Sequence, residues 1–124
     1  RVENRDLPAY YNSADVICVP SQYEEGFGRI ILEALSCGCP VIASRRGGIP
    51  EAVDESVGLL IEPDAANIRN AIQSLVTRPE MFARLRSNCR PYAEKRFGPA
   101  NAGRIINAYQ IGYQRNSLTP DVST

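Results

Sequence analysis

Two carboxylates flank a glycine-containing turn that leads into an apolar stretch. The turn reads Glu25-Gly26-Phe27-Gly28, and Glu33 follows within the apolar stretch. Glycines adopt backbone angles that other residues avoid, and they let a ligand come close to the main chain. The open N–H groups and the dipole at a helix start favour an anion. Because carboxylates accept hydrogen bonds from hydroxyl groups, the sequence predicts a ligand that is part phosphate and part sugar.

Glu33 also has a purely structural interpretation. The residues from Gly28 to Cys37 are apolar at nearly every position, which is typical of a helix buried on all sides. A buried carboxylate is costly unless it has a partner. Arg29 lies four residues earlier on the same helical face, where an ion pair can form. Ligand binding and a structural ion pair are therefore both open for Glu33, and Glu25 alone could be an ordinary solvated acid.

Short β-branched runs alternate with helical stretches along the chain. Strands are predicted near residues 16–20, 40–44 and 58–61. Strands that alternate with helices indicate a parallel sheet joined by right-handed crossovers, which is an α/β, Rossmann-like fold with flanking helices. The predicted helices are these: Asp6, as a cap, to Ser13; 29–37; a short one from Pro50; 64–77; 79–97; and 99–114.

The region around the two acids resembles one enzyme family. Glu25 and Glu33 have the E-x7-E spacing of the retaining family 4 (group 1) glycosyltransferases, which have the GT-B fold. Further blocks resemble that family in the same order over residues 1–112: Asp6-Leu7-Pro8-Ala9-Tyr10-Tyr11, Ala14-Asp15-Val16, Pro20-Ser21, Gly38-Cys39-Pro40-Val41-Ile42-Ala43-Ser44, Gly47-Gly48-Ile49-Pro50-Glu51-Ala52-Val53 and Gly58-Leu59-Leu60. Because these blocks occur in order, the chain is identified as a member of this family.

The resemblance implies a site for a nucleoside-diphosphate sugar. It implies that Glu25 is the catalytic carboxylate, which holds hydroxyls of the transferred sugar. It also implies that Glu33 holds the ribose hydroxyls. It implies no metal and no cofactor, because GT-B enzymes neutralise the leaving diphosphate with helix dipoles and cationic side chains. The sugar and diphosphate are implied to bind at the helix start, on the backbone of Gly26, Phe27, Gly28, Arg29 and Ile30.

The resemblance also implies that the chain is an N-terminally truncated part of the GT-B C-terminal domain. Residues 1–115 are expected to form a partial nucleotide-sugar-binding domain, and 116–124 a disordered polar tail. The acceptor-binding domain is missing, as are the first βα units with the family's phosphate-contacting Arg and Lys. We expect the fragment to be inactive alone and to have an exposed sheet edge that favours a homodimer.

Composition narrows the class of protein. The chain has 124 residues, 44% of them hydrophobic and 23% charged, as in an ordinary globular domain. It has no His, which excludes His-based triads, and its four Cys form no C-x-x-C pair, which favours buried free thiols. No apolar run approaches the roughly 18 residues that span a bilayer. We expect a cytoplasmic protein with a role in polysaccharide or glycolipid biosynthesis.

Charge is divided unevenly between the two halves of the chain. Residues 1–62 hold 5 basic and 10 acidic residues, and residues 63–124 hold 9 and 4. A solvated helical face explains the basic excess best, and contact with anionic lipid at the cytoplasmic face of a membrane is the sharper alternative. Nucleic acid is not expected, since no binding motif accompanies the charge. The excess lies mostly at Arg84, Arg86, Arg90, Lys95 and Arg96.

Three functions are compatible with these features of the sequence. The favoured one is the donor-binding part of a glycosyltransferase. The second is a non-catalytic Rossmann-like binding or regulatory module, which loss of either motif acid would have supported. The third is an unrelated α/β interaction domain, which the ordered series of motifs disfavours.

Overall fold

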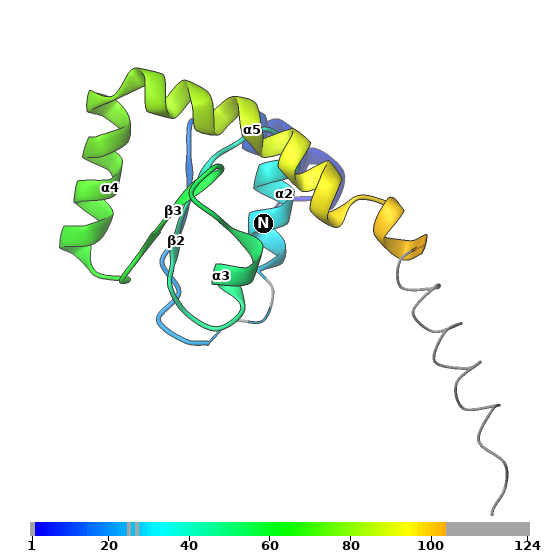
Figure 1. Ribbon diagram of the computed structural model, residues 1–124, viewed down its shortest axis with the longest axis horizontal. Coiled ribbons are helices and arrows are strands. Elements are labelled where there is room, and N and C mark those ends of the chain that lie inside the picture. The colour runs from blue at the N-terminus through cyan, green and yellow to red at the C-terminus, as the bar shows by residue number, and fades with distance from the viewer. Residues whose placement is uncertain (1, 25, 27, 104–124) are drawn as a thin grey trace, which may run out of the picture.

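The computed structural model describes residues 2–24, 26 and 28–103. Its centre is a three-stranded parallel sheet with the strands in chain order (Figure 1). The strands are β1 (Ile17–Val19), β2 (Val41–Ser44) and β3 (Gly58–Ile61). Cys18 pairs with Ile42, and Ile42 pairs with Leu59. The predicted parallel α/β fold is therefore confirmed, and each strand lies within its expected range.

Helices occupy the connections between these strands. The first connection carries α2 (Arg29–Ser36), and the second carries the short α3 (Ile49–Ala52). The other elements are η1 (Asn4–Asp6), α1 (Leu7–Ser13), α4 (Ala65–Thr77) and α5 (Pro79–Phe97). Residues 100–103 are helical, while the rest of the helix expected over 99–114 lies outside the described residues, as does the tail 116–124.

Local signals explain where several helices begin and end. The Asp64 carboxylate accepts a hydrogen bond from the Asn67 amide at 2.8 Å and so caps α4. Gly38 follows α2 with a φ of 76°, the left-handed conformation that ends a helix. The expected cap at Asp6 is wrong, because its side chain makes no capping hydrogen bond. The turn of η1 leads directly into α1, so the Asp6 backbone is helical rather than extended as in a typical capping residue.

The core lies on both faces of the sheet. Successive side chains of a strand point to opposite faces, and β2 shows this at its centre. Val41 and Ala43 belong to a buried cluster with residues of α2, α3 and the second half of α5, whereas Ile42 packs with α4 on the other face. Asn88 of α5 donates to the Ser56 carbonyl just before β3 begins, at 3.1 Å. The helix α5 therefore passes near the amino end of β3 (Figure 1), opposite to the loops at the carboxyl ends of the strands.

Two expectations about burial are wrong, the second of them in part. The apolar stretch after Gly28 does not form a helix buried on all sides: Ile31, Ala34 and Leu35 are buried, but Ile30 is 52% exposed. The reason is that only one face of α2 packs on the sheet and on α5. The expected burial of the thiols holds for Cys39 and Cys89, whereas Cys37 is half-buried and Cys18 is exposed. Cys18 lies on β1, an edge strand with no partner on its outer side among the described residues. A homodimer through that edge stays a prediction.

The basic residues of α5 are largely paired within the chain. Arg86 lies 3.7 Å from Asp15, and Arg90 lies 2.9 Å from Glu94. Arg96 also has an acidic neighbour, Asp54. These ion pairs are consistent with a solvated helical face. Contact of α5 with anionic lipid stays a prediction. Within the described part of the chain, no helix has both the length and the apolar character needed to cross a membrane.

Candidate functional site

The start of α2 has the backbone geometry of an open helix N-terminus. Gly28 precedes the helix with a φ of 67°, and its carbonyl accepts from the amide of Ile31 at 2.9 Å. A Cβ atom at Gly28 would lie 2.9 Å from Ile31 Cδ1, so both conformation and packing favour glycine. The next two amides, of Arg29 and Ile30, have no acceptor among the described residues. Amides at a helix start that have no acceptor within the helix can donate to an anion.

The two glycines of the turn are not equivalent. No described atom lies within 4 Å of a Cβ atom placed on Gly26, so packing does not require glycine there. Glu25 and Phe27 lie outside the described residues. Their roles in holding the sugar and the diphosphate stay predictions.

The Glu33 carboxylate has two donors in the structure. The Nε of Arg29 donates to its Oε1 at 3.0 Å, which is the ion pair weighed from the sequence. The hydroxyl of Tyr11, on α1, donates to its Oε2 at 2.9 Å. The Glu33 side chain is 30% exposed, so its carboxylate still reaches solvent. The ion pair alone does not explain Glu33, because a second helix contributes a donor to the same group.

Tyr11 is the functional candidate that reasoning from the sequence missed. It lies in the Tyr10-Tyr11 part of the family-like lead-in, and nothing in that pattern shows which tyrosine faces the acid. Burial and the hydrogen bond to Glu33 raise the pKa of Tyr11 to about 12. Its hydroxyl therefore keeps its proton and remains a donor at neutral pH.

A groove between α1 and α2 contains this constellation. Its volume is about 500 Å³, and its lining combines apolar side chains with Tyr11, Arg29 and Glu33. Leu7 on α1 and Leu32 on α2 are among the apolar side chains. The carboxylate thus lies at a concave surface, where a ligand could reach it.

The loops at the carboxyl ends of the strands are tied to one another. Gln22, after β1, donates to the Pro63 carbonyl, after β3, at 2.6 Å. Arg46, after β2, lies 2.8 Å from the Glu62 carboxylate, after β3. Ser44 at the end of β2 is fully buried, and its hydroxyl has no partner within the described part of the chain. Ligands of open α/β sheets bind at this end of the strands.

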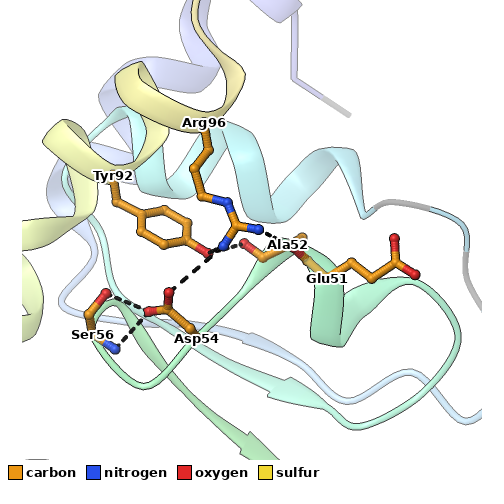
Figure 2. Close-up of polar contacts among 6 residues, drawn as sticks. All are labelled: Glu51, Ala52, Asp54, Ser56, Tyr92 and Arg96. Atoms are coloured by element: carbon orange, nitrogen blue, oxygen red, sulfur yellow. Dashed lines mark hydrogen bonds and ion pairs between the residues drawn. The ribbon is translucent and has the colours of Figure 1, made fainter. Parts of the chain in front are cut away.

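A polar network anchors the far end of α3, as Figure 2 shows. The Tyr92 hydroxyl of α5 donates to the Ala52 carbonyl at 3.2 Å, and Arg96 donates to the Glu51 carbonyl at 3.2 Å. Arg96 also donates to the Tyr92 hydroxyl at 2.6 Å and lies 3.8 Å from the Asp54 carboxylate. These donors satisfy carbonyls that the end of a helix leaves open. The network therefore holds α3 against α5. The helix α3 directly follows the loop after β2.

Comparison with known proteins identifies the family. The family described as glycosyl transferases group 1 matches residues 1–96. The chain belongs to this family. It is 42% identical over 93 residues to a D-inositol 3-phosphate glycosyltransferase of Saccharomonospora viridis, an alignment that covers 73% of the chain and 21% of the relative.

Solved structures agree with the family. HepE of Anabaena, solved with UDP and with UDP-glucose, superposes with TM-scores of 0.76 and 0.74 at 30% identity, over 91% of the chain and 30% of HepE. The C-terminal domain of the group 1 family protein LpcC of Francisella tularensis has a TM-score of 0.69 and 27% identity, over 80% of the chain and 51% of that domain. The chain thus has the fold of the C-terminal domain of GT-B glycosyltransferases. It spans about a quarter of the length of the curated group 1 relatives it matches.

Proposed function

We propose that this chain is the donor-binding part of a glycosyltransferase that transfers a sugar from a nucleoside-diphosphate sugar with retention of configuration. The observation that carries the proposal is the Glu33 carboxylate, which is held by two donors in a groove on α2. Membership of the group 1 family supports it. So does the likeness to HepE, which has been solved with UDP and with UDP-glucose.

The start of α2 is proposed to bind the diphosphate. The amides of Arg29 and Ile30, the Gly28 turn and the helix dipole together favour an anion. The Arg29 side chain is 80% exposed and already pairs with Glu33, so we assign the phosphate contact to its amide rather than to its guanidinium. We propose that the helix dipole and backbone amides balance the charge of the diphosphate, and that this chain binds no metal ion for that purpose.

Glu33 is proposed to hold the ribose. Each carboxylate oxygen has two lone pairs, and one on each oxygen is used by Arg29 or Tyr11. The remaining lone pairs can accept hydrogen bonds from the two ribose hydroxyls. By the family resemblance, Glu25 is proposed to hold hydroxyls of the transferred sugar, next to the reacting carbon.

The acceptor is proposed to bind a separate N-terminal domain of the whole enzyme. The family's phosphate-contacting Arg and Lys are proposed to come from upstream βα units. On this proposal, the 124-residue chain binds the donor weakly and does not catalyse transfer alone. A cytoplasmic location, with contact at the cytoplasmic face of a membrane, belongs to the same proposal.

The direct test is nucleotide binding by the protein expressed from its complete gene. UDP, GDP and ADP are titrated calorimetrically against the wild type, Glu33→Gln and the control Glu55→Gln, whose side chain is an exposed acid outside this groove. We expect one nucleotide to bind, Glu33→Gln to weaken its binding, and Glu55→Gln and EDTA to leave it unchanged. If none of the three binds, the proposal fails. If a nucleotide binds but no nucleotide sugar is turned over, a non-catalytic binding module is favoured.

A further inference from the structure

We propose that Tyr11 is a positioning residue, which orients the Glu33 carboxylate toward the ribose and so favours ribonucleotides over deoxyribonucleotides. The inference deepens the proposed function and rests on it. Its basis is the hydrogen bond from the Tyr11 hydroxyl to Glu33 Oε2, at 2.9 Å, inside the groove between α1 and α2.

Arg29 alone cannot fix the orientation of this carboxylate. Arg29 and Glu33 are four residues apart on one helix, and the Arg29 side chain is 80% exposed. An exposed ion pair between long side chains costs conformational entropy, and it holds its geometry weakly. Arg29 therefore stabilises the negative charge of Glu33 but does not hold the carboxylate in one orientation.

Tyr11 can hold the Glu33 carboxylate in one orientation, because Tyr11 lies on α1 and Glu33 lies on α2. Its side chain packs against the buried cluster on the α2 face of the sheet, so the ring is held in place. Tyrosine has few rotatable bonds, and a packed ring presents its hydroxyl with little loss of entropy. A donor on α1 and a donor on α2 together fix both oxygens of the Glu33 carboxylate relative to the two helices.

Ser36, another polar residue of α2 that lines the groove, is engaged elsewhere. The Ser36 hydroxyl donates to the Leu32 carbonyl at 2.7 Å, within its own helix. The Tyr11 hydroxyl is protonated at neutral pH, as in an ordinary tyrosine, and burial and the Glu33 carboxylate raise its pKa further, to about 12. The direction of the free lone pairs on Glu33 thus depends on Tyr11, and these lone pairs are the acceptors proposed for the 2′- and 3′-hydroxyls.

The test compares ribonucleotide and deoxyribonucleotide binding in Tyr11→Phe and in a matched control. Tyr10→Phe removes the same group from the same helix, but Tyr10 is 60% exposed and its hydroxyl has no partner among the described residues. The ligands are the nucleotide that binds most tightly among UDP, GDP and ADP, and its 2′-deoxy counterpart, titrated against the protein expressed from its complete gene.

We expect Tyr11→Phe to weaken ribonucleotide binding by about threefold to tenfold, the effect of one lost hydrogen bond. Binding of the 2′-deoxy nucleotide should be weakened less than binding of the ribonucleotide, because only its 3′-hydroxyl still contacts Glu33. Tyr10→Phe should change neither. A purely structural role for Tyr11 would weaken both ligands equally, or neither, and either result overturns the inference while leaving the proposed function intact.

A second variant tests whether the effect of Tyr11→Phe passes through Glu33, and thermal melting of each variant shows whether it is folded. Since Tyr11 acts through Glu33, the double variant Tyr11→Phe/Glu33→Gln should bind the ribonucleotide no more weakly than Glu33→Gln alone. Additive losses would show that Tyr11 acts independently of Glu33 and would overturn the inference. If the wild type binds none of the nucleotides, or binds both sugar forms equally, ribose recognition by Glu33 fails as well.

Discussion

The Nε of Arg29 donates to Oε1 of Glu33 at 3.0 Å, one helical turn away, and the pair is open to solvent. The Arg29 side chain is 80% exposed and that of Glu33 is 30% exposed. Exposed pairs at this spacing contribute only about 0.3–0.5 kcal/mol to stability. The ion pair with Arg29 therefore contributes little stability, and ligand binding by Glu33 stays a prediction.

The first prediction separates these two roles of Glu33. Glu33→Gln should weaken nucleotide binding by about tenfold to a hundredfold, because a charge-assisted hydrogen bond contributes roughly 1.5–3 kcal/mol. Arg29→Gln should shift the melting temperature slightly, as a lost exposed pair does. Calorimetric affinity and thermal melting of both variants check this. If affinity is unchanged and both variants melt equally early, Glu33 is a structural acid.

The second prediction concerns Glu25 in the complete enzyme. If Glu25 holds sugar hydroxyls beside the reacting carbon, Glu25→Gln should mainly lower kcat, since geometry and charge change there in the transition state. Glu33→Gln should instead mainly raise KM, because the ribose is remote from that carbon and its binding is uniform. Steady-state kinetics with the nucleotide sugar would distinguish them. A raised KM with unchanged kcat in Glu25→Gln would contradict the assignment.

The strands and most helices could be predicted from the sequence, because they follow from local patterns. Short apolar runs predict all three strands, and Gly38 predicts the end of α2. The burial of α2 could not be predicted in the same way. Apolar composition does not show how much of a helix the rest of the fold covers, and Ile30 is exposed although it is as apolar as Ile31.

The candidate site shows the same division. The turn and Glu33 can be proposed as a site from the sequence, because their motif is continuous. The contact between Tyr11 and Glu33 joins residues 22 positions apart. It depends on how α1 packs beside α2, and no local pattern records that packing. Tyr10 and Tyr11 are adjacent and chemically identical, so only the three-dimensional structure shows which one donates to the acid.

The third prediction concerns the conformation of Gly28. Gly28→Ala should destabilise the protein by about 1–2 kcal/mol, because Gly28 has a φ of 67° and an added Cβ atom would lie 2.9 Å from Ile31 Cδ1. Gly26→Ala is the matched control, since no described atom lies within 4 Å of its added Cβ atom. Thermal melting checks both variants. Equal losses of stability would show that the left-handed conformation of Gly28 is not the cause.

The fourth prediction tests the network that anchors α3 to α5. Tyr92→Phe removes the donor to the Ala52 carbonyl and the acceptor for Arg96 (Figure 2). Ala52 is fully buried, so its carbonyl would lose a partner that water replaces poorly. We expect a loss of about 1–2 kcal/mol in the free energy of unfolding.

Tyr23→Phe is the control for Tyr92→Phe, since Tyr23 is 84% exposed and should tolerate the same change without effect. Urea titration of both variants gives the difference in unfolding midpoint. Nucleotide affinity should stay within about twofold of the wild type in Tyr92→Phe, because the Tyr92 hydroxyl contacts the carboxyl end of α3 and Tyr92 does not itself line the groove that contains Glu33. If affinity falls with stability unchanged, the network belongs to the binding site rather than to the scaffold that supports it.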